Sequence, residues 1–242
     1  MKHFGLIGHP LSHSFSKKYF TEKFTNNAID ADYINIEIEQ LVSVDFVKQH
    51  QLSGFNVTIP HKQNILPFLN EIDEEAKGVG AVNTVKVLPN GNLIGYNTDV
   101  FGFRQSLKPF LESHHERALI LGTGGASKAV NYVLKNLGIS VLFASRNPNN
   151  TNQIAYCDIN EFVIKSHKLI VNTTPLGMSP NEDSCPEIPY QFLSKEHLVY
   201  DLVYNPAETI FLKNGKSCSA KTLNGLSMLH LQAEKAWEIW NE

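Results

Sequence analysis

Residues 118–146 read ALILGTGGASKAVNYVLKNLGISVLFASR, and this stretch decides the fold. A short apolar run, Ala118–Leu121, stops at a glycine-rich turn, Gly122–Gly125. Apolar residues then recur at helical spacing, and Gly138 stands where a helix would stop. A second apolar run follows at Val141–Ala144. The stretch therefore predicts a strand, a turn, a helix and a second strand within about 30 residues.

A βαβ unit of this kind is typical of dinucleotide-binding proteins. Gly122 permits the tight turn, Gly124 lets the backbone approach a pyrophosphate, and the start of the helix offers free N–H groups to that anion. The pattern is imperfect, because Ser127 holds the position of the third glycine. A buried strand-to-helix turn can also use glycine without any ligand. The flanking strands and helix favour nucleotide binding.

The end of the second strand bears on which nucleotide is bound. An NAD site places an acid about 20 residues after the first glycine, where it binds the ribose 2′-hydroxyl. Here the sequence is Ser145-Arg146-Asn147, and no acid follows before Asp158. A guanidinium can pair with a 2′-phosphate, whereas a carboxylate would repel it. We therefore expect NADP rather than NAD, the alternative being that Arg146 is only a solvated charge.

Composition limits the classes of function. The chain has 242 residues, 42% of them hydrophobic and 19% charged, which is ordinary for a globular protein. The net charge is −3 without a basic block, so nucleic acid is not an expected partner. No apolar run is long enough for a membrane span or a signal peptide. Three cysteines without metal spacing indicate reduced thiols, no metal site and a cytoplasmic protein.

Strands alternate with helices along the chain, which predicts an α/β fold with a mostly parallel sheet in each half. We expect two domains separated by a cleft: an N-terminal α/β substrate domain, residues 1–100 plus 224–242, and a Rossmann-type NADP-binding domain, residues 101–223. The terminal helix is expected to return to the first domain. Local expectations in the first domain include a helix capped by Ser16, a helix over 41–49 and a loop over 54–60.

Polar residues recur where the strands of the first domain are expected to end. They are Ser14, Ser16, Asn56, Thr58, Lys62, Asn83 and Asp99. The carboxyl ends of parallel strands gather at one edge, so these groups are expected to lie together. Hydroxyls, amides, one ammonium and one carboxylate suit a small polyhydroxylated acid. Each residue taken alone also has a plain structural explanation, such as a helix cap or a satisfied turn.

These residues lie in four of eight motifs that follow one another along the chain. The motifs are HSFS (13–16), NVTIPHK (56–62), GAVNT (80–84), NTDVFG (97–102), GTGGASK (122–128), NTTPLGM (172–178), DLVYNP (201–206) and GLSMLHLQ (225–232). In content and order they resemble the shikimate dehydrogenase family, from residue 5 to residue 233.

The resemblance implies reversible NADPH-dependent reduction of 3-dehydroshikimate to shikimate, a step of chorismate and aromatic amino-acid biosynthesis, by a monomer or homodimer. It implies Lys62 and Asp99 as the catalytic pair. The residues implied to bind substrate are Ser14, Ser16, Thr58, Asn83, Tyr204 and Gln232. Those implied to bind NADP are Gly122, Gly124, Gly125, Ala126, Ser145, Arg146, Thr173, Val203 and Gly225.

The residue types agree with this chemistry. A hydride arriving at a ketone carbon leaves negative charge on the oxygen, which needs a proton donor within hydrogen-bond reach. Lys62 can donate, and Asp99 can orient it. Asp99 favours the ammonium whereas burial favours the neutral amine, so the sequence leaves open whether Lys62 transfers the proton or only polarises the carbonyl.

Departures from the family pattern leave alternatives open. The second arginine that usually follows the phosphate-binding arginine is missing after Arg146, so selectivity for NADP is expected to be weaker than usual. The alternatives are a quinate/shikimate dehydrogenase with relaxed use of NAD, a non-catalytic metabolite-binding relative, and hydride transfer to an acyclic substrate. The presence of Lys62 and Asp99 speaks against the non-catalytic reading.

Overall fold

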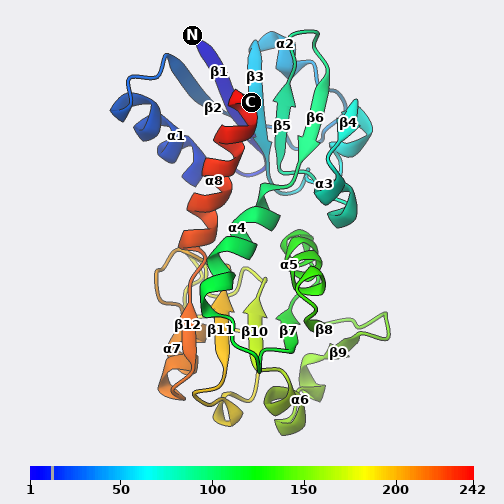
Figure 1. The fold of residues 1–242 in the computed structure, drawn as a ribbon, viewed down its shortest axis with the longest axis vertical. Coiled ribbons are helices and arrows are strands. Elements are labelled where there is room, and N and C mark those ends of the chain that lie inside the picture. Colours follow the sequence, from blue (N-terminus) through cyan, green and yellow to red (C-terminus); the bar gives the residue numbers. More distant parts are fainter. Residues whose placement is uncertain (12–13) are drawn as a thin grey trace. The chain divides into compact units, whose positions relative to one another are not determined.

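The computed structural model describes residues 1–11 and 14–242, and in it the chain forms two compact units. One unit comprises Met1–Phe101 together with Gln232–Glu242, and the other comprises Gly102–Leu231. Both boundaries fall inside helices, α4 (Thr98–Leu107) and α8 (Leu226–Asn241). Each unit contains its own six-stranded sheet, so the predicted two-part α/β fold is confirmed (Figure 1).

The first unit is built on a mixed sheet with strand order β2-β1-β3-β5-β6-β4. Strand β1 pairs in parallel with β2 and β3, whereas β5 is antiparallel to β3 and to β6. The strands are β1 (Lys2–Gly8), β2 (Ala31–Glu37), β3 (Leu52–Val57), β4 (Glu71–Ile72), β5 (Thr84–Val87) and β6 (Leu93–Tyr96). The other elements are α1 (Phe15–Asn26), α2 (Phe46–Gln49), α3 (Glu74–Val79) and a 3₁₀ turn at Leu66–Phe68.

Alternation along β1 divides the core of this unit into two layers. Phe4 and Leu6 lie in one buried cluster with Phe20 and Trp240, whereas Ile7 lies in a second cluster. This follows from the period of two in a strand, which sends successive side chains to opposite faces. The Phe4 ring stacks on Trp240 at 4.7 Å, so the end of α8 packs within this unit.

The second unit has a fully parallel sheet with strand order β12-β11-β10-β7-β8-β9. The strands are β7 (Arg117–Leu121), β8 (Ser140–Ser145), β9 (Gln153–Ala155), β10 (Leu169–Asn172), β11 (Leu198–Asp201) and β12 (Lys221–Leu223). The helices are α5 (Gly125–Asn136), α6 (Glu161–Ser166) and α7 (Ile210–Ser217), with 3₁₀ turns at Lys108–Phe110, Tyr156–Asp158 and Tyr190–Phe192. Residues 118–121 are completely buried, as expected for a parallel strand covered on both faces.

Three local expectations were wrong. The helix α1 is capped by Ser14 and not by Ser16: the Ser14 Oγ accepts from the Lys17 backbone N–H at 3.3 Å. The helix starts earlier than expected because Phe15 joins it and stacks on Tyr19. His13, the first residue of the HSFS motif, lies outside the described residues.

The other two errors concern residues 41–60. Only Phe46–Gln49 is helical, since Ser43 and Asp45 hydrogen-bond each other locally and compete with a helix. The segment expected as a loop begins with strand residues of β3, from Gly54 to Val57. Gly54 is a packing glycine: a Cβ there would collide with the indole of Trp240.

Within the part of the chain that the structure describes, no helix is both long enough and apolar enough to span a bilayer.

Candidate active site

Lys62 and Asp99 form an ion pair in the first unit. Their Nζ and Oδ2 atoms are 2.6 Å apart, and the side chains are only 20% and 13% exposed. Lys62 lies in the turn that follows β3, where its carbonyl accepts from the Val82 N–H at 2.8 Å. Asp99 lies in the first turn of α4, where the helix dipole favours a carboxylate. The backbone of each partner is therefore fixed in position by local structure.

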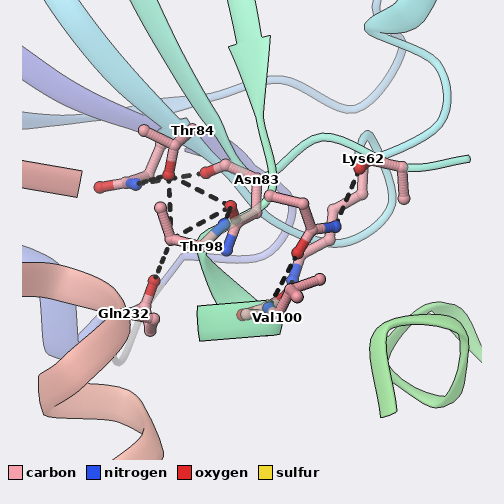
Figure 2. A network of polar contacts seen from close by, with 10 residues as sticks. Lys62, Asn83, Thr84, Thr98, Val100 and Gln232 are labelled. Carbon is pink, nitrogen blue, oxygen red and sulfur yellow. Dashed lines mark hydrogen bonds and ion pairs between the residues drawn. The ribbon is translucent and has the colours of Figure 1, made fainter. Parts of the chain in front are cut away.

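A network of buried polar groups occupies the same edge of the sheet. The Asn83 Oδ1 accepts from the Thr98 N–H at 2.7 Å and from the Thr84 hydroxyl at 3.1 Å, and it lies 3.2 Å from the Thr98 Oγ1. The Thr98 hydroxyl also lies 3.3 Å from the Gln232 Oε1 (Figure 2). The network thus joins the start of β5, the start of α4 and the terminal helix.

The network continues inward through Asn56. Its Nδ2 lies 3.0 Å from the Thr84 Oγ1, and its Oδ1 accepts from the Tyr33 hydroxyl at 2.7 Å. Burial raises the pKa of Tyr33 well above its ordinary value, while a hydrogen bond with Ser16 lowers it. Ser16, a predicted substrate ligand, is therefore tied to the same network.

Ser14 and Thr58 lie at the ends of neighbouring parallel strands. Ser14 follows β1 as the cap of α1. Thr58 follows β3, donates its N–H to the Ile7 carbonyl at 2.9 Å and accepts from the His61 N–H at 2.8 Å. Because β6 runs in the same direction as β3, the start of α4 after β6 lies at this edge too. The sheet topology therefore explains why Ser14, Thr58 and Asp99, which are far apart in the sequence, lie at the same edge.

The second unit has its topological switch point between β7 and β10. Strand β7 comes first in sequence, β8 and β9 follow on one side, and β10, β11 and β12 follow on the other. The loops after β7 and β10 therefore leave in opposite directions, which opens a crevice for a ligand at their carboxyl ends. Thr173, the residue after β10, donates from both N–H and Oγ1 to the Leu121 carbonyl, at 3.0 and 2.7 Å.

The glycine turn lies at this switch point. Gly122 has a φ of +98°, and a Cβ there would come within 2.8 Å of the Thr174 side chain. Gly124 is the N-cap residue of α5, and the space beside Gly124 and Gly125 is open. Ser127 is buried and donates to the Gly124 carbonyl at 2.6 Å, so it closes the turn where a third glycine is usual. The open turn and the helix start, which includes Ala126, fit a pyrophosphate.

The end of β8 carries a buried serine and an exposed arginine. The Ser145 Oγ accepts from the Asn147 N–H at 3.2 Å, which shapes the turn, and Arg146 faces solvent. Burial raises the pKa of Tyr156, and the positive charge of Arg146 opposes that rise. No acid occupies this strand end, so the site suits a phosphate better than a bare ribose hydroxyl.

The remaining predicted residues lie beyond β11. The Gly225 N–H donates to the Val203 carbonyl at 3.0 Å, which brings the segments before α8 and after β11 together. Tyr204 is half-buried, and burial raises its pKa. Tyr204 belongs to the second unit, whereas the other five predicted substrate ligands belong to the first.

Comparison with known proteins agrees with this geometry. Residues 6–85 match the family of shikimate dehydrogenase substrate-binding domains. The NADP(+)-dependent shikimate dehydrogenase of Methanococcus maripaludis strain C7 is 41% identical to the chain, over 98% of the chain and 90% of that protein. The chain belongs to the shikimate dehydrogenase family. The predicted family and oxidoreductase class are thereby confirmed.

Solved structures of shikimate dehydrogenases and related enzymes share the fold. The enzyme from Thermus thermophilus, in complex with NADP(H) and shikimate, is 30% identical with a TM-score of 0.86, over 99% of this chain and 93% of that one. The quinate dehydrogenase from Corynebacterium glutamicum, in complex with NAD, is 28% identical with a TM-score of 0.87, also over 99% and 93%. The fold is therefore shared by enzymes that bind NADP(H) and by an enzyme that binds NAD.

Sequence reasoning missed several buried polar residues of the chain. Thr84 and Thr98 belong to quoted motifs, but the local pattern does not indicate that they are buried, since alternation along β5 puts Thr84 on the same face as Lys86. In the second unit, Asp201 is fully buried and accepts from Asn172, Val203 and Thr209 at 2.9, 3.0 and 2.6 Å. Burial raises the pKa of Asp201 to about 6.

A hollow of about 350 Å³ in the second unit does not belong to this site. It is lined by parts of α4, β11 and β12 and by none of the glycine turn. Several of its polar groups have partners in the chain: the buried hydroxyls of Ser106 and Tyr200 are 2.6 Å apart, and the Asn224 amide donates to the Ala207 carbonyl at 2.9 Å. We therefore assign no ligand to it. Among the described residues, no group of three or more His, Cys, Asp or Glu could hold a metal ion.

Proposed function

We propose that the chain catalyses the reversible NADPH-dependent reduction of 3-dehydroshikimate to shikimate. The observation that carries the proposal is the Lys62–Asp99 ion pair, 2.6 Å long, beside a network of amides and hydroxyls at one edge of the first sheet. This combination supplies one proton donor and several hydrogen-bonding groups, as a hydroxylated ketone substrate requires.

Lys62 and Asp99 carry the chemistry in this proposal. Bound NADPH supplies the hydride. Lys62 donates a proton from Nζ to the carbonyl oxygen as negative charge develops on it, and takes the proton back in the reverse direction. Asp99 fixes the position of Nζ through the 2.6 Å ion pair and stabilises the ammonium.

The remaining residues hold the two ligands. Hydroxyls and amides of Ser14, Ser16, Thr58, Asn83 and Gln232, with the phenol of Tyr204, bind the carboxylate and hydroxyls of the substrate. The glycine turn, Gly122–Ala126, holds the pyrophosphate, and Ser145 and Arg146 bind the 2′-phosphate. Thr173, Val203 and Gly225 line the rest of the NADP site. The free, partly exposed cysteines support a cytoplasmic location, and we expect a monomer or homodimer.

A quinate/shikimate dehydrogenase using NAD is the second candidate, since the fold is shared with an NAD-bound quinate dehydrogenase. Arg146 and the lack of an acid at the end of β8 count against it.

The test is loss of NADPH absorbance when purified protein meets 3-dehydroshikimate, with 3-dehydroquinate and NADH as the competing pair. We expect kcat/KM to be highest with 3-dehydroshikimate and NADPH. Preference for 3-dehydroquinate or NADH would favour the second candidate, and absence of turnover with every pair would refute both.

A further inference from the structure

The network in Figure 2 can be read proton by proton, because two of its groups have only one possible role. The Asn83 backbone carbonyl can only accept a hydrogen bond, and the Thr98 backbone N–H can only donate one. These two groups determine which way each amide and hydroxyl around them must face.

The Asn56 amide is oriented first. Its nitrogen lies 3.2 Å from the Asn83 carbonyl, an obligatory acceptor, so the NH₂ group must face that way. The same NH₂ lies 3.0 Å from the Thr84 Oγ1, which therefore accepts. The Asn56 Oδ1 on the other side receives the Tyr33 hydroxyl at 2.7 Å. Thr84 is thus left with its own proton to donate.

That proton goes to the Asn83 Oδ1, 3.1 Å away. The same oxygen receives the Thr98 N–H at 2.7 Å, and these two donors occupy its two lone pairs. The Thr98 hydroxyl lies 3.2 Å from this filled oxygen and 3.3 Å from the Gln232 Oε1. The Thr84 Oγ1 is a further neighbour at 3.2 Å, but it already accepts from Asn56 and donates to Asn83, so the Gln232 Oε1 is the acceptor assigned to the Thr98 proton.

The side-chain amides of Asn83 and Gln232, two proposed substrate ligands, are thereby oriented alike. Asn83 and Gln232 use their oxygens inside the network, so their NH₂ groups are the atoms left to meet a ligand. Two such donors select ligand oxygens that accept. An apolar atom or a second donor there would leave an amide N–H unpaired, at a cost of about 1–3 kcal/mol.

We infer that Thr98 is a positioning residue for substrate: its hydroxyl orients Gln232 so that the amide NH₂ faces a substrate oxygen. This inference rests on the proposed function and deepens it, since it adds to the recognition of an accepting oxygen a residue that acts through Gln232. Thr98 is 1% exposed, which agrees with a role exerted through its neighbours.

The test compares Thr98→Val, which keeps the shape and removes the hydroxyl, with Thr98→Ser, which keeps the hydroxyl. We expect T98V to raise KM for 3-dehydroshikimate about tenfold while kcat and KM for NADPH stay within about threefold of wild type. T98S should restore KM. Adding T98V to Gln232→Met should raise KM no further than Q232M alone, because coupled residues are not additive.

Three results would overturn the inference: an unchanged KM in T98V, equal impairment in T98S and T98V, or additive effects in the double variant. If T98V does not fold, Thr98→Ala is judged by the same comparisons. A wild-type chain that does not reduce 3-dehydroshikimate refutes the proposed function instead, whatever the variants do. With an active wild type, the variants test Thr98 alone.

Discussion

The two units build their proposed ligand-binding edges in different ways. The Gly102–Leu231 unit presents backbone: a glycine turn with open space beside it and the start of α5. The unit that contains the first 101 residues presents side chains, and these are held by the buried network around Asn83 and Thr98.

This difference predicts which substitutions each edge tolerates. A backbone site is damaged when an atom is added, because its function depends on space and on unobstructed N–H groups. A side-chain network is damaged when a polar atom is removed, because its partners are left buried and unpaired. The following predictions test this contrast, from the largest expected effect to the smallest.

Removing the ammonium of Lys62 should have the largest effect. Lys62→Ala is expected to lower kcat about 10²–10⁴-fold, because no other group replaces the proton donor. KM for NADPH should stay near the wild-type value. Steady-state kinetics in both directions measure this. The matched control is Lys77→Ala, which removes an exposed lysine paired with Glu74 in the same unit. Near-normal turnover in K62A would remove Lys62 from the proposed mechanism.

Asp201 is a buried side chain of the second unit, and its titration should make the free energy of unfolding depend on pH. Burial raises its pKa from 3.8 to about 6, so between about pH 4 and 6 the folded chain holds more protons than the unfolded chain. The contribution of Asp201 to the free energy of unfolding should therefore fall as pH rises through this window, by at most about 3 kcal/mol.

Asp201→Asn removes this titration. The free energy of unfolding is measured in urea for wild type and D201N at several pH values. As pH rises from about 4 to 7, the wild type should lose stability relative to D201N. Parallel curves for the two proteins would show that Asp201 does not titrate in this range.

A methyl group in the glycine turn should impair the backbone site. Gly122→Ala is expected to weaken NADPH binding about 10–100-fold, since φ is +98° and the new Cβ would lie 2.8 Å from Thr174. Gly91→Ala is the control: φ there is +86° in the β5–β6 turn, but the space is open. G91A should lose about 1 kcal/mol of stability and no NADPH affinity. Equal NADPH affinity in the two variants would contradict a nucleotide site at Gly122.

Arg146 should have the smallest effect. Arg146→Ala is expected to lower the ratio of kcat/KM for NADPH to that for NADH about tenfold, because one charge-assisted contact to the 2′-phosphate is lost. The control is Arg117→Ala, another exposed arginine, located at the amino end of β7. The idea fails if the cofactor ratio is the same in R146A and R117A.

Local rules were sufficient for the glycine turn and the strands beside it. Residues 118–146 combine a buried apolar run, a turn glycine and a helical repeat, and the structure places β7, α5 and β8 there. The Asn90-Gly91 turn signal likewise matches the β5–β6 hairpin. In these segments the residues that determine the structure are close together in the sequence.

The same rules failed where side-chain packing decides the local structure. The sequence pattern predicts a loop at Gly54, but Gly54 is a strand residue whose missing side chain makes room for Trp240. The sequence pattern predicts Ser16 as a helix cap, but Phe15 packs on Tyr19 within α1, so the helix starts earlier and Ser14 is its cap.

The sequence by itself determined the family, the nucleotide-binding type of the second unit and the residues proposed for catalysis, because motifs of fixed spacing encode them. Only the tertiary structure decided which polar groups share protons. Thr84, Thr98 and Gln232 come from three separate segments, and their hydrogen bonds exist only when β5, α4 and α8 meet. A hydroxyl can donate to one acceptor at a time, so the direction of each amide depends on partners that the local sequence does not contain.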